Sequence, residues 1–244
     1  IRDRGIALAT GLRIRELART GEYVLFGSKE TRLDRSSIRF HDAPDGAAVV
    51  ANGDEWLYVS NCESKDGNGK GGVFVLKFDQ DGEIKGYEPR LLDTTRNCNG
   101  GLTPWKTWVS CEEYGKGQCW QVDPFGVHEP EPTVIGEPEG GSFEAFVSFV
   151  RVCLVLVDIL LSHLVPSILR IAQTYDDRDA DQLVFFVTED HARGALRRFR
   201  TNNVDPSNLW DSLHGTGTRD YLKLDPAAGT FEWTSSLDEG RRNA

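Results

Sequence analysis

The sequence predicts an all-β fold, a partial β-propeller, and two repeated patterns carry this prediction. The first is a strand of buried character that ends in a carboxylate. The second is an alternating strand followed by an aspartate and a turn glycine. Such patterns at the spacing of a propeller blade, roughly 40 to 50 residues, favour a propeller over a sheet of alternating strands and helices.

The first pattern joins aromatic and β-branched residues to a terminal acid, which suits a buried strand that delivers an acid to the end of a sheet. It occurs three times, at residues 56–63, 108–113 and 185–190. Because each occurrence ends the same type of strand, we expect three acids at equivalent sheet ends with converging side chains. These acids are Glu63, Glu112 and Glu189.

The second pattern predicts matching hairpins in successive blades. It comprises residues 73–79 with Gly82, residues 119–123 with Gly126, and residues 221–225 with Gly229. Helical periodicity is restricted to residues 6–19 and to an apolar run that begins at Val147. We therefore expect one helix near the amino end and strands through most of the remaining chain.

The spacing of the repeats identifies an insertion. Val59 and Val109 are 50 residues apart, whereas Val109 and Val187 are 78 residues apart. Between the last two lies a 27-residue segment, 147–173, whose apolar composition differs from both flanks, and its removal restores a spacing of 51. The sequence therefore predicts a single incomplete propeller domain over residues 1–244, interrupted by an apolar insertion of helical character at 147–173.

Three explanations of this segment differ in origin. A membrane-spanning helix needs about 20 mainly apolar residues with few charges. The segment contains Arg151, Asp158, His163 and Pro166, which argues against a membrane role. Codons for Val147 and Ser148 permit a splice donor and a codon for Gln173 permits an acceptor, so the segment is either a translated intron or a genuine surface insertion.

Composition limits the partners. The chain has 28 basic and 38 acidic residues and a net charge of −10, which repels nucleic acid and attracts cations. Its five cysteines contain no C-x-x-C pair, which argues against a structural zinc site. The chain begins at Ile1 without methionine, so we expect a mature, trimmed or fragmentary sequence, and it contains no visible signal peptide. The residues do not indicate an oligomeric state.

Residues 97–113 contain the densest group of chemically capable residues. They read Asn-Cys-Asn-Gly-Gly-Leu-Thr-Pro-Trp-Lys-Thr-Trp-Val-Ser-Cys-Glu-Glu. This run resembles the signature of PhoX-type alkaline phosphatases and their β-propeller relatives, in which Asn-Cys-x-Gly-Gly leads through Thr-Pro-Trp and Thr-Trp to Cys-Glu-Glu. Shorter resemblances follow in order at residues 41–46, 60–63, 143–145 and 188–190, so the resemblance extends from about His41 to Ala244.

The resemblance implies an exported six-bladed propeller, secreted or periplasmic, of which this chain would form about half. It also implies a central site holding calcium and iron. By this resemblance Cys98 is the thiolate ligand, and further metal ligands come from the acids Glu63, Glu112, Glu113, Glu144, Glu189 and Asp190. Catalytic and substrate-binding residues stay unassigned. Thr188–Asp190 and the residues after it match the relatives of unknown activity better than the known phosphatases.

Elementary chemistry agrees with this implication. Carboxylate oxygens suit calcium, whereas a thiolate suits a softer metal such as iron. Converging carboxylates repel one another, and an anionic phosphomonoester can approach them only where metal ions reverse the local charge. We therefore expect a metal-dependent hydrolase of small phosphate esters, with little activity in this chain alone. The alternative is a calcium-stabilised, non-catalytic propeller that binds a partner on its face.

Two further pairs of residues in the 97–113 run have structural interpretations. Gly100 and Gly101 either let the backbone approach a metal closely or form a plain turn. Trp105 and Trp108 are expected to pack between blades.

Overall fold

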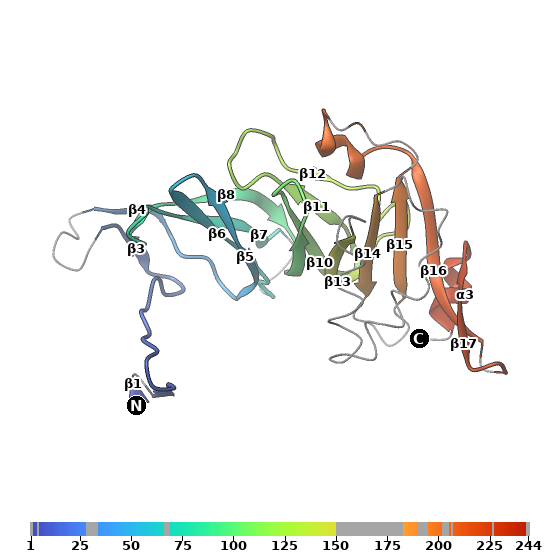
Figure 1. Ribbon diagram of the computed structural model, residues 1–244, viewed down its shortest axis with the longest axis horizontal. Helices are drawn as coiled ribbons and strands as arrows, with labels where there is room; N and C mark the ends of the chain where they lie inside the picture. The colour runs from blue at the N-terminus through green and yellow to red at the C-terminus, as the bar shows by residue number, and fades with distance from the viewer. Residues whose placement is uncertain are drawn as a thin grey trace.

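A computed structural model describes residues 2–3, 5–27, 34–65, 69–149, 183–189, 195–201, 205, 207–225 and 227–242. Antiparallel strands dominate these residues, and three principal sheets follow one another along the molecule from the blue-green to the orange part of the chain (Figure 1). The prediction of an all-β chain is confirmed.

The first sheet is a four-stranded meander. Its strands are β5 (Pro44–Asn52), β6 (Glu55–Cys62), β7 (Gly71–Phe78) and β8 (Ile84–Thr94), which pair in chain order. A tight turn joins β7 to β8, in which the Asp79 carboxylate accepts the N–H groups of the two residues at positions 81 and 83. Between them Gly82 adopts a φ of +74°, a conformation that glycine takes without steric cost.

The second sheet has the same meander order. Its strands are β9 (Asn97–Leu102), β10 (Trp108–Gly117), β11 (Cys119–Val122) and the short β12 (Glu131–Pro132). The turn after β11 repeats the chemistry of the turn after β7. Asp123 accepts the N–H groups of Phe125 and Val127, and Gly126 has a φ of +75°.

The third sheet continues the series with one additional strand. Its members are β13 (Gly141–Phe149), β14 (Val184–Glu189), β15 (Leu196–Thr201), β16 (Gly217–Asp225) and β17 (Thr230–Thr234). A short stretch of pairing between β10 and β13 joins it to the second sheet.

The three sheets are arranged as successive propeller blades. Their first strands are neighbours in space, because β9 contacts both β5 and β13. Their second strands β6, β10 and β14 contain Val59, Val109 and Val187, each with no exposed surface. The repeat predicted from the strand pattern therefore corresponds to the second strand of three successive sheets.

The hydrophobic core lies mainly between the sheets. One cluster joins the first two sheets and contains Val50, Leu57, Val59, Val73, Val75, Leu91, Trp108 and Val122. A second cluster joins the second and third sheets, and Trp105 packs against it with its ring perpendicular to that of Phe185. Its members are Cys98, Val109, Cys111, Cys119, Ile135, Phe143, Phe146, Phe185, Val187, Phe199 and Leu213. The expectation that Trp105 and Trp108 pack between blades is confirmed.

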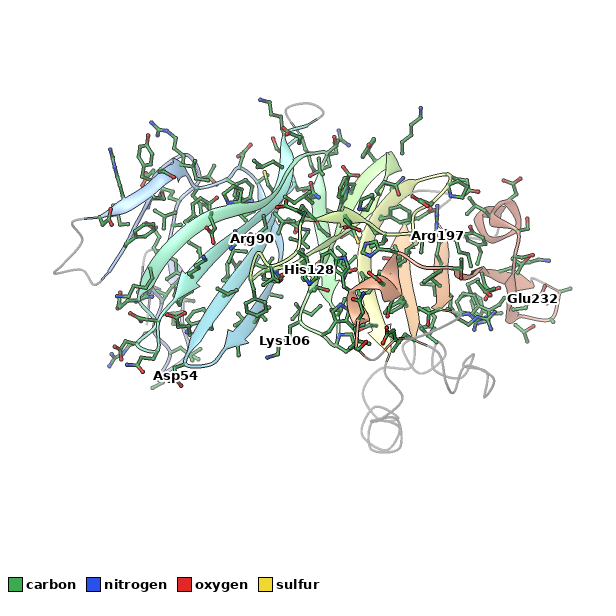
Figure 2. All side chains as sticks on the ribbon, turned by 90° about the horizontal axis from the view of Figure 1, so that it is seen from above. Asp54, Arg90, Lys106, His128, Arg197 and Glu232 are labelled. Atoms are coloured by element: carbon green, nitrogen blue, oxygen red, sulfur yellow. The ribbon has the colours of Figure 1, made fainter. Side chains whose placement is uncertain are left out.

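The connection between β11 and β12 also ties the sheets together. Arg90 of the first sheet donates a hydrogen bond to the Pro124 carbonyl at 3.0 Å. Further along, His128 stacks on Trp210 of the 3₁₀ helix η3 (Leu209–Leu213), with ring centroids 4.6 Å apart. Figure 2 shows Arg90 on the first sheet, Arg197 on the third and His128 between them.

The prediction of a helix over residues 6–19 is wrong. Strand β1 (Arg2–Asp3) pairs with β2 (Ile6–Ala7), and the chain from Leu8 to Arg19 forms turns and irregular segments. Gly11 has a φ of +92°, which interrupts helical geometry, and Leu12 is 62% exposed. A short helix is marginally stable by itself, and Leu17 and Ala18 pack against a core cluster as irregular chain.

Two further small elements complete the chain. Strand β3 (Tyr23–Leu25) pairs with β4 (Arg35–Arg39) beside the first sheet. A six-residue helix, α3 (Leu237–Arg242), lies against β16 near the carboxyl end (Figure 1).

The third hairpin of the second repeat is one strand out of place. Residues 73–79 and 119–123 include the third strands β7 and β11, whereas residues 221–225 lie in β16, the fourth strand. The third strand of the last sheet is β15, which carries Arg197, Arg198 and Arg200. Arg197 pairs with Glu189, and Arg198 and Arg200 share Asp220. These arginines leave the strand without the apolar signal on which the prediction relied.

The apolar segment 147–173 begins inside the third sheet. Val147, Ser148 and Phe149 are the last residues of β13 and pair with residues 186, 185 and 184 of β14. Residues 150–173 lie outside the described part of the chain, so the intron or insertion stays a prediction. Among the described residues, no helix is both long and apolar enough to cross a membrane.

Candidate metal centre

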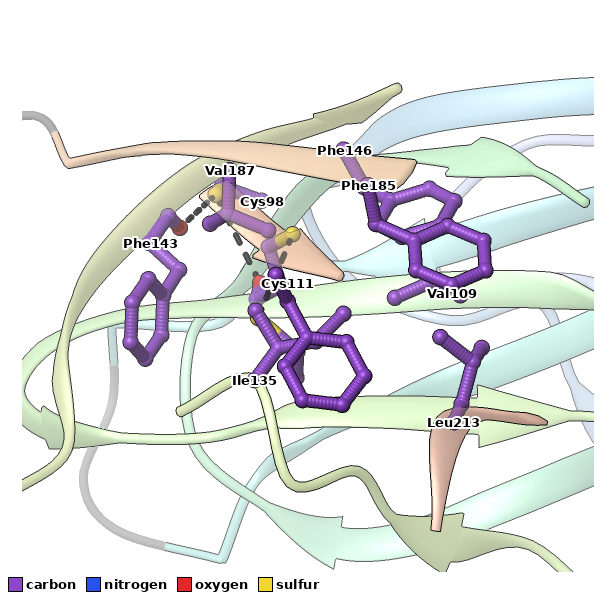
Figure 3. Packing of buried hydrophobic residues seen from close by; sticks show 11 residues of the cluster. Cys98, Val109, Cys111, Ile135, Phe143, Phe146, Phe185, Val187 and Leu213 are labelled. Atoms are coloured by element: carbon purple, nitrogen blue, oxygen red, sulfur yellow. Dashed lines mark hydrogen bonds between the residues drawn. The ribbon is translucent and has the colours of Figure 1, made fainter. Parts of the chain in front are cut away.

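Cys98 is held at the start of β9, where the second and third sheets meet. The side chain is 1% exposed, and its thiol donates to the carbonyl oxygens of Phe143 at 3.1 Å and Cys111 at 3.5 Å (Figure 3). Burial raises the pKa of this thiol, and the nearby Glu144 carboxylate raises it further. A thiolate at this position therefore requires a positive charge beside it.

Two carboxylates approach the thiol from neighbouring strands. Glu113 comes from β10 and Glu144 from β13, and the three ligand atoms lie within 4.8 Å of one another. Two atoms bound to one ion at about 2.3 Å can be at most about 4.6 Å apart, so little movement would be needed to share a cation. Both carboxylates are half-buried. One soft sulfur and two hard oxygens fit a site for a transition metal, for calcium or for both.

Two glycines let β9 lie close enough to its neighbours to build this group. A Cβ on Gly100 would clash with the Val109 carbonyl, and one on Gly101 would clash with the Phe146 carbonyl. Both residues are in β9, so the plain-turn interpretation is wrong. The glycines act by backbone approach, which is what strand interiors use glycine for.

Asn61 fixes the other side of β9. This fully buried side chain donates to the carbonyls of Cys98 at 3.0 Å and Asn99 at 2.9 Å. Its own oxygen accepts from the Trp108 indole at 2.8 Å and the Ser110 hydroxyl at 3.0 Å. The strand pattern predicted no role for Asn61, although an amide beside buried apolar residues of a strand is a signal for a buried hydrogen-bond network.

Glu112 is buried beside this group but is held by protein donors. Its carboxylate accepts the N–H groups of Thr95 at 2.7 Å and Gln118 at 2.9 Å, and the Trp120 indole at 3.2 Å. These bonds connect the start of β9, the β10–β11 turn and β11. Glu112 therefore fixes the backbone that presents Glu113, and it lies outside the three-residue group.

Glu63 follows β6 on the first sheet. Its carboxylate forms an ion pair with Lys65 at 3.1 Å. The hydrogen bond that Lys65 donates to Glu63 raises the pKa of Lys65, and the charge of Glu113 raises it further. Burial and the charge of Glu63 both raise the pKa of Asp45.

Glu189 ends β14 and is paired within the protein. It forms an ion pair with Arg197, and its second oxygen accepts the Ala195 N–H at 3.0 Å. Both charged side chains are almost completely buried. Asp190 lies outside the described residues.

Of the seven predicted ligands, three lie together: Cys98, Glu113 and Glu144. Within the described ranges, Glu63, Glu112 and Glu189 belong to no group whose ligand atoms lie this close, so their convergence stays a prediction. The strand ends are equivalent, but each acid meets different neighbours there. The ion pairs and N–H donors around each carboxylate determine where that carboxylate points.

Comparison with known proteins supports the family resemblance. The family model described as alkaline phosphatase PhoX matches residues 71–149, which include Cys98, Glu113 and Glu144. The predicted resemblance to the PhoX type is confirmed over this segment. No curated protein matches the sequence.

One solved structure supports the fold. The structure of Pseudomonas fluorescens PhoX in complex with vanadate, a transition state analogue, matches with a TM-score of 0.52 and 14% identity. The match covers 77% of this chain and 46% of that one, so this chain spans about half of its length. An exo-1,5-alpha-L-arabinanase from a bovine ruminal metagenomic library gives 13% identity and a TM-score of 0.33, with coverage of 78% and 72%, and supports no structural argument.

Proposed function

We propose that this chain, PhoX-type over residues 71–149, supplies part of the metal centre of a phosphomonoesterase, with Cys98, Glu113 and Glu144 as ligands. The observation that carries this proposal is the group of one buried thiol and two carboxylates, all within 4.8 Å. Its residues come from the first strands of two adjacent sheets and from β10 between them. The substrate class is a small phosphate ester.

Calcium and iron are the metals we propose, because two carboxylates and a thiolate offer both hard and soft ligands. When bound, such ions neutralise the carboxylates, polarise the phosphoryl oxygens and lower the pKa of a coordinated water. The protein's part is to hold the ligands in place. Asn61 and Glu112 do this through four and three hydrogen bonds, respectively.

Basic side chains beside the group would help an anionic ester to approach. Lys65 and Arg96 are both exposed, and their charges influence each other. The Arg96 carbonyl accepts the Glu113 N–H at 2.9 Å, which places this arginine next to a proposed ligand. Exposed cations near a site raise the local concentration of anions, an effect that weakens with salt.

The first experiment is elemental analysis of the purified chain and of its Cys98→Ser and Glu113→Gln variants. We expect bound iron to fall in the Cys98→Ser variant and both metals to fall in the Glu113→Gln variant. Glu139→Gln, an exposed acid outside the group, is the matched control and should keep both metals. Equal metal content in all four proteins would overturn the ligand assignment.

Activity is tested with p-nitrophenyl phosphate. Because this chain matches only 46% of the PhoX structure, we expect slow hydrolysis by the 244-residue chain and faster hydrolysis by a protein of full PhoX length. Calcium without iron, together with no hydrolysis at either length, would support the non-catalytic binding module instead. We also propose an exported location, which fractionation of expressing cells would test.

A further inference from the structure

Two cysteines outside the proposed ligand set face each other across the second sheet. Cys111 of β10 is directly opposite Cys119 of β11 in the strand register. Their sulfur atoms are 4.0 Å apart, and neither residue has any exposed surface. Neither side chain belongs to the proposed ligand group, although the backbone carbonyl of Cys111 accepts the Cys98 thiol.

The backbone between these residues has the spacing that a disulfide needs. Cys111 and Cys119 are the last pair of the β10–β11 register, and one position further the Glu112 N–H donates to the Gln118 carbonyl at 3.0 Å. Cα atoms of directly opposite residues in an antiparallel ladder are about 4.5 Å apart or slightly more. Disulfides join Cα atoms about 4.4 to 6.8 Å apart, so side-chain rotation could close the remaining gap between the sulfurs.

The other two described cysteines are directed elsewhere. Cys98 belongs to the same core cluster, but its thiol points at the carbonyls of Phe143 and Glu144. Cys62 is on the first sheet, where its thiol donates to the Lys70 carbonyl at 3.4 Å. The fold therefore selects one pair.

We propose that Cys111 and Cys119 form a cross-strand disulfide when the chain folds in the presence of a disulfide oxidant. Two thiols and one small disulfide, R–S–S–R, give the cystine and two R–SH molecules, so the protein loses two protons and two electrons, which the small disulfide takes up. Both sulfurs are inaccessible after folding, so the exchange takes place before or during folding. This bond would leave Cys98 as the only thiol of the described residues in that core cluster.

This inference does not depend on the proposed phosphatase activity. The disulfide would also affect the backbone beside the metal centre, because Cys111 directly precedes Glu112, which holds that backbone by hydrogen bonds, and the ligand Glu113. A bond between β10 and β11 would restrict the local opening of the turn that Glu112 holds. We expect the oxidised chain to unfold at a higher temperature than the reduced chain.

The sequence makes the test simple, because trypsin places the five cysteines in five different peptides. These are residues 40–65, 97–106, 107–116, 117–151 and 152–170. The reduced, denatured 244-residue chain is refolded with a mixture of reduced and oxidised glutathione, denatured again with N-ethylmaleimide, digested and analysed by mass spectrometry. We expect peptide 107–116 linked to peptide 117–151, and three alkylated cysteines.

Cysteines eight positions apart also meet by chance in an unfolded chain, so the same equilibration in guanidinium is the reference. We expect the ratio of disulfide to dithiol to be at least tenfold higher in native buffer than in denaturant. The Cys98→Ser variant should give the same linked peptide. Five alkylated cysteines, a link that includes peptide 97–106, or an equal ratio in both solvents would each overturn the proposal.

Discussion

Glutamates at the ends of the second and third sheets have different neighbours. At the third sheet, Glu189 is neutralised by Arg197, whose guanidinium also donates to the Gly140 carbonyl at 2.7 Å and lies 4.7 Å from the Phe143 ring. At the second sheet, Glu113 meets Glu144 and the Cys98 thiol. A carboxylate at a strand end therefore does not by itself indicate a metal ligand, since the neighbouring strand decides which cation it meets.

The two ends are adjacent through one residue. The Phe143 carbonyl accepts the Cys98 thiol (Figure 3), whereas the Phe143 ring packs against Arg197. The Glu189–Arg197 ion pair and the candidate metal centre thus both contact Phe143. Changes to each should separate a stability role from a ligand role.

The largest effect is expected for Arg197→Met. This substitution leaves the Glu189 carboxylate buried without its cation, and such a loss costs about 3 to 5 kcal/mol of unfolding free energy. Urea unfolding measures it. The double variant Arg197→Met/Glu189→Gln removes both charges and should recover part of the loss. If the double variant is no more stable than the single variant, the ion pair is not the source of the effect.

Beside the first sheet, a third buried ionisable group, the imidazole of His41, is kept uncharged. His41 accepts or donates at 3.0 Å to Tyr87 and to Ser60, and burial lowers its pKa to about 4. In the unfolded chain its pKa is near 6.5. The neutral histidine therefore stabilises the fold fully above pH 6.5, and this contribution is lost as the pH falls to about 4.

The expected loss is about 3 kcal/mol between pH 6.5 and pH 4, because each pKa unit corresponds to about 1.4 kcal/mol. Unfolding free energies measured by urea at half-unit pH intervals give the slope. His41→Gln should reduce this slope above pH 5, where few carboxylates titrate. Parallel slopes for the two proteins would show that His41 is not the titrating group.

Glu112 and Glu113 form a matched pair of adjacent residues with different expected roles. Glu112→Gln removes charged acceptors from three donors and should lower stability by about 2 kcal/mol. Glu113→Gln should change stability less but weaken metal binding at least about tenfold. Urea unfolding in chelator and metal titration measure the two effects. Weaker metal binding in Glu112→Gln and a larger stability loss in Glu113→Gln would exchange the structural and ligand assignments.

The smallest effect is expected for removal of residues 147–173, with Phe146 joined to Thr174. Val147 is 49% exposed, and Thr174 and Tyr175 can continue β13, so the loss should be below about 1 kcal/mol. Joining Phe149 to Thr174 instead keeps all of β13 and is the control. Improved solubility of both variants would support a foreign segment. A loss of several kcal/mol in both would show that residues 150–173 belong to the core.

The strand-rich fold and its repeat could be predicted from the amino-acid sequence alone, because the alternation of apolar and polar residues is a local property. Val59, Val109 and Val187 lie at equivalent buried positions, as their common pattern predicted. The Asp79 and Asp123 turns were visible for the same reason. The run from Asn97 to Glu113 also identified the PhoX-type segment directly.

Which acids lie next to the Cys98 thiol could not be predicted in this way, because it depends on tertiary packing. Glu144 reaches Cys98 because Gly101 lets β9 and β13 approach, and Glu189 turns to Arg197, a residue that strand patterns treat as polar and exposed. Partners of a buried charge come from strands far apart in sequence, so no local pattern encodes them. The amino end also depends on tertiary packing, because Leu17 and Ala18 pack against a core cluster as irregular chain and not as a helix.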